Sequence, residues 1–521
     1  MSLESARRLA CLVPALLAAL LLPAAAALPD GDAPSAGPAW NLTIFHTNDT
    51  HSAFLPRPAA WRDDGRLVGG VAALSAHLAD ERRHAAPDLF LDAGDFMTGN
   101  PISRLQEDGV PGGAVARLLN ALGYDAGTIG NHEFDLGYAD LVRLVPLIRF
   151  PLLAADLRLA TGEPAFRAEP LILERGGLKV GIIGVSCAGM SEVVTPERLG
   201  PVVLADQAAL VRNLAAGIDP RTDLIVLITH DGVETDRELA RALDGSGVDV
   251  IVGGHSHTRL KQPELEAGIL IVQAGGNMTN LGRLDLRVQD DRIVAHNGRL
   301  IDLWADDGTA PLADPTVVAL ADSYGARVQA EFGQVIGTLA TELRKGGGET
   351  NIGNFLADAL RAQAGTDVGL INSGGIRKNV PAGPVTALDV QEVLPFGNAL
   401  VKADLTGEQV ARIVQTNADG AVGGDHGILQ ISGLAYVYRT AADGTAAEVV
   451  EITVDGQPLA PDRVYTVAMP DFVAQMTDVY LGVGPVTAAD TGVTLDQAVV
   501  AEFARQGTVD AAIEGRIVRI Q

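Results

Sequence analysis

The sequence of 521 residues predicts a layered α/β protein with roughly two or three domains. Hydrophobic residues make up 47% of the chain and charged residues 20%, which is a globular composition with enough apolar side chains for a sizeable core. From residue 42 to about residue 303, short apolar runs alternate with longer segments of helical periodicity. Strands that alternate with helices in this way are typical of layered α/β folds.

The amino-terminal residues have the pattern of an export signal. Arg7 and Arg8 precede the apolar run 9–22, and a stretch of small residues ends near Ala27. This order is typical of a secretory signal peptide with its cleavage site near Ala27. A retained membrane anchor is the less favoured alternative, because prolines lie within and directly after the run and no basic stop follows it. We expect a signal peptide over residues 1–27, a leader over 28–40, export to the periplasm or the medium, and no stable membrane span.

Charge and cysteine content limit the classes of partner. The formal net charge is −26, which argues against nucleic-acid polymers as ligands because they require basic patches. An anionic substrate would need locally concentrated positive charge, such as bound metal. The only cysteines are Cys11 and Cys187, so removal of the signal leaves Cys187 alone and no intramolecular disulfide can form. The exported chain must then be stable through its core.

In the first region, the apolar runs predict strands and the periodic segments between them predict helices. Strands are expected over 42–47, 89–93, 126–129, 152–155, 180–185, 224–229, 248–252 and 269–273. Helices are expected over 70–84, 113–122, 138–147, 207–216 and 237–243. Several strands are followed at once by polar residues, and α/β folds place their sites at the carboxyl ends of strands.

A helix is also expected over 314–332, because Pro315 suits a first helical turn and apolar residues follow at helical spacing. We interpret it as a linker to a second α/β region. There the sequence predicts a helix over 351–364 and strands over 434–439, 449–454 and 464–468.

Residues that can bind metal follow the predicted strands repeatedly. Five of the ten histidines lie at these strand ends, which random placement would not produce. Imidazole together with carboxylate suits divalent metals such as Mn, Zn, Fe or Co, and no cysteine joins the pattern to favour a thiolate zinc site. One carboxylate can bridge two cations about 3.5–4 Å apart, and such pairs catalyse in-line displacement at phosphorus. The residues concerned are Asp49, His51, Asp95, Asn131, His132, His230, His255 and His257.

Taken in order, these motifs resemble those of the calcineurin-like metallophosphoesterases, and within them the secreted 5′-nucleotidase/UDP-sugar hydrolase family. The matching segments are Thr47-Asn48-Asp49-Thr50-His51, Gly94-Asp95, Gly130-Asn131-His132-Glu133-Phe134-Asp135, Thr229-His230 and Gly254-His255-Ser256-His257. The resemblance covers nearly all of the chain after the leader. It implies a four-layer αββα catalytic domain over 41–313, a linker helix over 314–333 and a nucleotide-binding α/β domain over 334–521.

The resemblance also implies a role for each residue of the strand ends. Asp49, His51, Asp95 and His257 would hold one divalent metal ion. Asp95, Asn131, His230 and His255 would hold the second, so that Asp95 bridges the two ions. A hydroxide between the ions would attack phosphorus in line, and His132, oriented by Asp135, would assist. The metals remain open among Mn, Zn, Co, Fe and Mg.

In the second region, the resemblance assigns residues to the nucleotide. Asn372 would lie near the base, and Arg377, whose planar guanidinium suits phosphate, near phosphate or ribose. Phe396 and Phe472 match the two aromatic residues that stack on the base, and Asp478 matches a ribose-binding aspartate.

This sequence departs from the family pattern at two places. Met476-Thr477 stand where the family often has two glycines before the ribose-binding aspartate. A second phosphate-facing arginine lies farther from the helix start at Asn351 than in the family, so Arg344 or Lys345 could contact phosphate only after a shift of the loop.

The expected activity is release of phosphate from nucleotides by an exported dimetal hydrolase, most simply a 5′-nucleotidase of nucleotide catabolism. The alternatives are a UDP-sugar hydrolase, a 2′,3′-cyclic-nucleotide phosphodiesterase, a sulfur-compound hydrolase of the same superfamily and, in another class, a surface-binding protein that retains the fold. Phe396 and Phe472 count against the sulfur compound, and the intact ligand set counts against the surface-binding protein. The sequence leaves the preferred base, the number of phosphates and the oligomeric state open.

Overall fold

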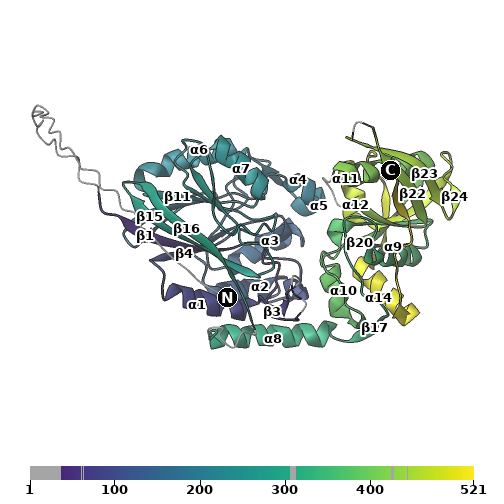
Figure 1. Cartoon of the computed structure of the whole chain (residues 1–521), viewed down its shortest axis with the longest axis horizontal. Coiled ribbons are helices and arrows are strands. Elements are labelled where there is room, and N and C mark those ends of the chain that lie inside the picture. The colour runs from purple at the N-terminus through teal and green to yellow at the C-terminus, as the bar shows by residue number, and fades with distance from the viewer. Residues whose placement is uncertain are drawn as a thin grey trace, which may run out of the picture. The chain divides into compact units, whose positions relative to one another are not determined.

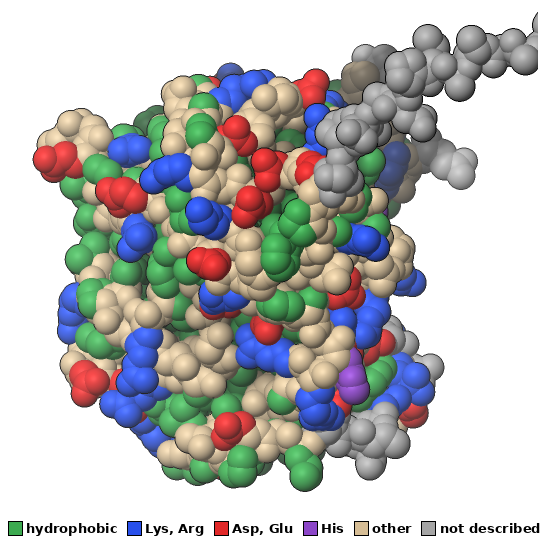
Figure 2. Space-filling view, turned by 90° about the vertical axis from the view of Figure 1, so that its left-hand side faces the viewer, with side chains coloured by type: hydrophobic (Ala, Val, Ile, Leu, Met, Phe, Trp, Pro, Cys, Tyr) green, Lys and Arg blue, Asp and Glu red, His purple; other side chains and the backbone are tan. Residues whose placement is uncertain are grey.

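The computed structural model describes residues 37–59, 62, 64–305, 312–423, 428–442 and 444–520. The signal peptide and the first part of the leader predicted from the sequence lie outside the described residues. No helix in the described part of the chain is both long and apolar enough to cross a bilayer. On the face drawn in Figure 2, acidic and basic side chains are interspersed over the surface.

The first region contains two six-stranded sheets. The order in one sheet is β16 (Arg292–Asp302), β15 (Asn280–Gln289), β1 (Trp40–Thr47), β4 (Asp88–Asp92), β5 (Ala126–Thr128) and β6 (Leu152–Leu153). The order in the other is β13 (Glu264–Glu266), β14 (Ile269–Val272), β12 (Val250–Val252), β11 (Leu224–Ile228), β9 (Leu178–Gly184) and β8 (Leu171–Arg175). In each sheet, four neighbouring strands run parallel to one another. They are β1, β4, β5 and β6 in the first sheet, and β14, β12, β11 and β9 in the second. Their carboxyl ends therefore lie along one edge of each sheet.

The sheets pack face to face and helices cover their outer faces. Along β1 the side chains alternate, so Leu42 and Ile44 belong to the core between the sheets while Phe45 packs with the helices outside. One outer face carries α1 (Val71–Arg82), α2 (Gly113–Leu122) and α3 (Tyr138–Leu144), and the other carries α6 (Gln207–Ile218) and α7 (Val233–Ala242). Figure 1 shows α6 and α7 on one side of the strands and α1 and α2 on the other. The prediction of a four-layer αββα domain is confirmed.

Shorter elements connect these layers. The small strands are β2 (Arg57–Pro58), β3 (Leu67–Val68), β7 (Leu157–Leu159) and β10 (Val202–Leu204). The short helices are η1 (Pro101–Arg104), η2 (His132–Phe134), η3 (Val145–Leu147), α4 (Met190–Val193), α5 (Pro196–Leu199) and η4 (Asp219–Arg221).

A single helix, α8 (Pro315–Phe332), precedes the second region. Its first turn is capped by Asp314, whose carboxylate accepts a hydrogen bond from the Thr316 backbone N–H at 2.7 Å. Val317, Ala321, Tyr324 and Val328 recur at helical spacing and are buried in the core beside α1 and α2. The helix therefore packs along the first region.

The second region is also α/β, as predicted. Its main sheet has the order β21 (Leu429–Ser432), β18 (Val368–Asn372), β25 (Val464–Pro470), β20 (Ala399–Thr406) and β26 (Ala488–Thr494). One core contains α9 (Asn351–Ala364), α10 (Ala387–Val393) and α14 (Leu495–Gln506), and another contains α11 (Gly407–Gly423) and α12 (Asp471–Gln475). The smaller sheets are β19 (Gly383–Thr386), β17 (Val335–Leu339) and β27 (Thr508–Val509), and β24 (Gln457–Pro458), β23 (Ala447–Val454), β22 (Leu434–Thr440) and β28 (Ile517–Ile520).

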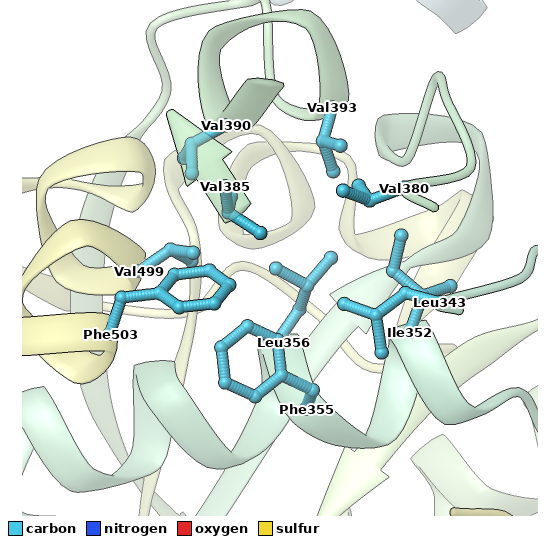
Figure 3. Close-up of a pocket in the computed structure, with 10 residues that line it drawn as sticks. All are labelled: Leu343, Ile352, Phe355, Leu356, Val380, Val385, Val390, Val393, Val499 and Phe503. Atoms are coloured by element: carbon cyan, nitrogen blue, oxygen red, sulfur yellow. The ribbon is translucent and has the colours of Figure 1, made fainter. Parts of the chain in front are cut away.

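The pocket drawn in Figure 3 belongs to the core between α9 and α14. The Phe355 and Phe503 rings meet edge to face beside it, with centroids 5.1 Å apart, and the Leu356 side chain points into the same space. Its lining residues are apolar and lack a group that could bind a phosphate or a metal ion. We therefore assign it to side-chain packing.

Candidate metal and nucleotide site

The structure brings the predicted metal ligands together at the strand ends of the two facing sheets. Asp49 and His51 follow β1, Asp95 follows β4, and Asn131 follows β5. His230 follows β11, while His255 and His257 follow β12. The site thus takes its residues from both sheets, because the parallel strands of each end on the same side.

One cluster consists of Asp49, His51 and His257. The His257 Nε2 lies 3.3 Å from the Asp49 Oδ1 and 2.9 Å from the His51 Nε2. The three ligand atoms lie within 4.8 Å of one another, which is the convergence a divalent cation requires. We call this group the Asp49 cluster.

The other cluster consists of Asp95, His230 and His255, and we call it the Asp95 cluster. The His230 Nε2 lies 3.0 Å from the Asp95 Oδ2, and the His255 Nδ1 lies 2.9 Å from the Asn131 Oδ1. Asp95 also groups with His51 and His132 within the same 4.8 Å limit. Its carboxylate therefore faces both clusters, as a bridging ligand must.

The protonation of these residues indicates that the site attracts positive charge. Burial lowers the pKa of His230, but the nearby Asp95 carboxylate outweighs it and raises this pKa to about 10. The Asp95 carboxylate thus favours positive charge at the His230 Nε2 position, 3.0 Å from its Oδ2. Burial, followed by the charge on His230, lowers the pKa of His255 to about 4, so that its ring is neutral and offers a lone pair. These side chains fit two divalent cations.

Hydrogen bonds behind the ligands fix the orientation of their rings. The Thr98 carbonyl lies 3.0 Å from the His51 Nδ1, and the Ala93 carbonyl lies 2.6 Å from the His230 Nδ1. A proton on each Nδ1 leaves the Nε2 free to face the clusters. The Asn48 side-chain amide donates to the Asp49 Oδ2 at 2.6 Å, which orients that carboxylate.

Backbone geometry at the site is unusual. Five of the proposed ligands have positive φ angles: Asp49 (50°), His51 (47°), Asp95 (56°), His255 (73°) and His257 (52°). A residue other than glycine in this region carries a conformational cost, and such residues concentrate at functional sites. At these five residues the left-handed backbone conformation turns the chain just after the strands, so that the ligands lie over the strand ends.

His132 lies beside the clusters and is paired with Asp135, as the sequence led us to expect. The His132 Nδ1 is 2.7 Å from the Asp135 Oδ2, and its Nε2 is 3.9 Å from the Asp95 Oδ2. Burial lowers the pKa of His132, but the carboxylates of Asp135 and Asp95 outweigh it and raise this pKa above its ordinary value. The ring is therefore oriented and favoured as the imidazolium.

The predicted nucleotide residues form two groups. The Phe396 ring stacks on His132 with centroids 5.3 Å apart, and the Arg377 guanidinium lies 5.6 Å from the Phe396 centroid. Phe472 contacts the Tyr480 ring at 5.7 Å. Asn372, at the end of β18, is buried, and its Oδ1 has no hydrogen-bond partner among the described residues. Asn372, Phe396 and Asn398 are among the residues that line one hollow.

The remaining predicted residues are exposed. Asp478 is exposed on the one-turn helix α13 (Thr477–Tyr480). The Arg344 side chain is 71% exposed and pairs with Glu342 at 2.7 Å. Desolvation and then the charge of Arg377 lower the pKa of Lys345, so Lys345 is a second cation near Arg377.

Glu133, to which the sequence analysis assigned no role of its own, supports the site from behind. Its side chain is buried and accepts hydrogen bonds from three backbone N–H groups. These come from Asp95 at 3.0 Å, Met97 at 3.0 Å and Gly130 at 2.6 Å. Glu133 therefore holds the Asp95 turn against the turn after β5. Only its place directly after His132 could have marked it.

Two family models match the chain. Residues 42–259 match the calcineurin-like phosphoesterase model, and residues 333–482 match the 5′-nucleotidase C-terminal domain model. Protein UshA of Escherichia coli K12 is 30% identical over 496 residues, which cover 85% of this chain and 86% of that protein. Endonuclease YhcR of Bacillus subtilis is 28% identical over 488 residues, and this chain covers only 39% of its length.

A solved structure agrees with these matches. The crystal structure of a 5′-nucleotidase precursor from Thermus thermophilus has a TM-score of 0.80 and 29% identity. The comparison covers 92% of this chain and 100% of that one. By its first domain the chain is a metal-dependent phosphoester hydrolase of the calcineurin-like class. Taken over both domains, it belongs to the 5′-nucleotidase family that includes UshA.

Proposed function

We propose that this chain is an exported phosphohydrolase that releases phosphate from nucleotides, most simply a 5′-nucleotidase. The observation that carries the proposal is the pair of candidate metal-binding clusters, in which Asp95 belongs to one cluster and lies within 4.8 Å of His51 of the other, next to an aromatic ring from the second region stacked on His132. Similarity to UshA and to the Thermus 5′-nucleotidase precursor supports the substrate class. The signal pattern before residue 28 supports export.

In this proposal, Asp49, His51, Asp95 and His257 hold one divalent cation, and Asp95, Asn131, His230 and His255 hold the other. The cations supply Lewis acidity and an activated water at neutral pH. Their charge, set against the Asp49 and Asp95 carboxylates, leaves about two positive charges for an anionic substrate. This local charge offsets the net charge of −26 on the whole chain.

The other residues act on the substrate. The His132 imidazolium, oriented by Asp135, donates a hydrogen bond to the phosphoryl group or its leaving oxygen. Arg377 faces the phosphate or ribose: burial lowers its pKa, and the carboxylates of Asp95, Asp135 and Asp49 on the catalytic side oppose that shift. Phe396 and Phe472 stack on the base, Asn372 offers its unpaired Oδ1 to the base, and Asp478 contacts the ribose. Arg344 was assigned to phosphate from the sequence, and Lys345 is the better placed candidate for that contact.

A substrate panel tests the proposal. The purified chain is assayed for phosphate release from AMP, UMP, ATP, UDP-glucose and 2′,3′-cyclic AMP, each with added Mn²⁺, Zn²⁺, Co²⁺ or Mg²⁺. We expect metal-dependent release to be fastest from a nucleoside 5′-monophosphate. Chromatography of the products separates the alternative activities: UMP and glucose 1-phosphate from UDP-glucose, or a nucleoside monophosphate from the cyclic nucleotide, with no phosphate released from AMP or UMP, would assign a UDP-sugar hydrolase or a cyclic-nucleotide phosphodiesterase. No release from any nucleotide would refute the proposal.

A further inference from the structure

Two arginines of the catalytic domain reach the segment that carries Phe396. Arg104, the last residue of η1, donates from its Nη2 to the Pro395 carbonyl at 3.0 Å. Arg198, in α5, donates from its Nη2 to the Phe396 carbonyl at 3.3 Å and to the Asn398 Oδ1 at 3.0 Å. The donors therefore hold the chain on either side of the Phe396 side chain.

Arg198 also lies beside the catalytic pair. Its Nη1 is 3.7 Å from the Asp135 Oδ1, and the two side chains are only 19% and 11% exposed. The guanidinium fork thus faces Asp135 with one nitrogen and the Phe396 segment with the other. One side chain connects the orientation of His132 to the position of an aromatic ring of the base-binding group.

The surroundings of the two arginines fit such a connection. Burial lowers the pKa of Arg104, and the charge of Arg198 lowers it further while Asp496 opposes the shift, so the two cations lie close together. The Arg198 charge also opposes the rise that burial causes in the pKa of Asp471, the residue that starts α12 directly before Phe472. Arg198 is therefore near both segments that carry a predicted stacking ring.

Gly397 gives independent evidence that Arg104 is closely fitted to this segment. A Cβ built on Gly397 would lie 3.0 Å from the Arg104 Nη2, and the φ of Gly397 is +65°. A side chain there would crowd the guanidinium in a backbone region that favours glycine. A side chain at position 397 would therefore require a strained backbone and a small shift of the Arg104 guanidinium.

We propose that Arg104 and Arg198 form a docking pair that positions Phe396 beside the catalytic residue His132. The pair makes hydrolysis selective for phosphoesters that carry a base. Both are positioning residues, since their contacts are with Pro395, Phe396, Asn398 and Asp135. This inference rests on the proposed nucleotide hydrolysis.

The test compares a substrate that has a base with one that lacks it. kcat/KM is measured for AMP and for p-nitrophenyl phosphate with the wild-type chain and with Arg104→Ala and Arg198→Ala. Loss of a hydrogen bond from a charged donor corresponds to about 10- to 100-fold in an equilibrium constant. We expect the ratio of the AMP value to the p-nitrophenyl phosphate value to fall by about that factor in each variant.

Two further variants show what the arginines contribute. Arg198→Lys keeps the charge near Asp135 but cannot reach both groups with a planar fork, so its ratio should stay below wild type. Arg241→Ala is the matched control, because Arg241 is 56% exposed and pairs only with the Glu266 carboxylate at 3.1 Å in the same domain. Its ratio should equal the wild-type ratio.

Equal losses on both substrates, or no loss in either variant, would overturn the docking pair. Hydrogen exchange gives a second measurement that needs no substrate: the amides of residues 394 and 396–398 should exchange faster in Arg104→Ala and Arg198→Ala than in wild type. If the wild-type chain cleaves p-nitrophenyl phosphate but no nucleotide, the proposed function fails. In that case hydrogen exchange alone tests the docking pair: unchanged amide exchange rates in the two variants would overturn it, and faster rates would support it.

Discussion

Gly130 has no space for a side chain beside the carboxylate that faces both clusters. A Cβ added at Gly130 would overlap the Asp95 Oδ1 and lie 2.8 Å from the Asp95 backbone nitrogen. Asp95 cannot easily move, because its Oδ1 accepts from the His132 backbone N–H at 2.8 Å and its own N–H donates to Glu133. Gly130→Ala should therefore displace a shared metal ligand.

Two magnitudes follow from this geometry. Overpacking of this kind costs about 1–3 kcal/mol of the free energy of unfolding. Disturbing the orientation of a metal ligand typically weakens metal affinity by about 10- to 100-fold. Titration of chelator-treated protein with Mn²⁺, read as phosphate release from AMP and as bound metal, measures the second effect, and urea unfolding measures the first.

The control is Gly217→Ala. Gly217 lies in α6 with no atom within 4 Å of an added Cβ, so alanine should raise stability by roughly 0.5–1 kcal/mol and leave metal affinity unchanged. If Gly130→Ala bound Mn²⁺ and released phosphate as the wild-type chain does, the close approach of Gly130 to Asp95 would be irrelevant and the reasoning would be refuted.

Other variants separate the roles of the ring and the catalytic pair. Phe396→Ala should raise KM for AMP by about 5- to 150-fold, since stacking on one base contributes about 1–3 kcal/mol, with little change in kcat; a fall in kcat at constant KM would contradict this. Asp135→Asn removes a carboxylate that raises the pKa of His132. Because the imidazolium is the active form, activity is lost as pH rises through the pKa of His132. The alkaline limb of the kcat/KM profile should therefore move to lower pH in Asp135→Asn. An unmoved limb would exclude the role of Asp135 in raising the pKa of His132.

The sequence predicted the elements that carry the site because each has a strong local pattern. The helices over 113–122 and 351–364 have the observed bounds of α2 and α9. The helix expected over 237–243 begins earlier, at Val233, where Glu234 and Asp236 lie favourably in the first turn. The hairpin of β15 and β16 was missed although its turn residues, Asp290 and Asp291, are typical of tight hairpins.

The strand-end histidines and aspartates were evident from the sequence, but the geometry that makes them converge was not. Positive φ angles at Asp49, Asp95 and His255 depend on contacts between both sheets, and a non-glycine residue gives no local signal for them. Likewise, Arg104 and Arg198 lie in short irregular segments, and their common target appears only when distant parts of the chain are in contact.

The central claim is that Asp95 joins two metal ions in a nucleotide-hydrolysing site. Metal content per chain, measured together with phosphate release from AMP for wild type and Asp95→Ala, tests it most directly. The account predicts about two divalent ions per wild-type chain. In Asp95→Ala it predicts loss of bound metal and a fall in turnover of about 1,000-fold or more, since metal catalysis contributes several kcal/mol. Full turnover by Asp95→Ala, or a wild-type chain that hydrolyses AMP without bound metal, would contradict it.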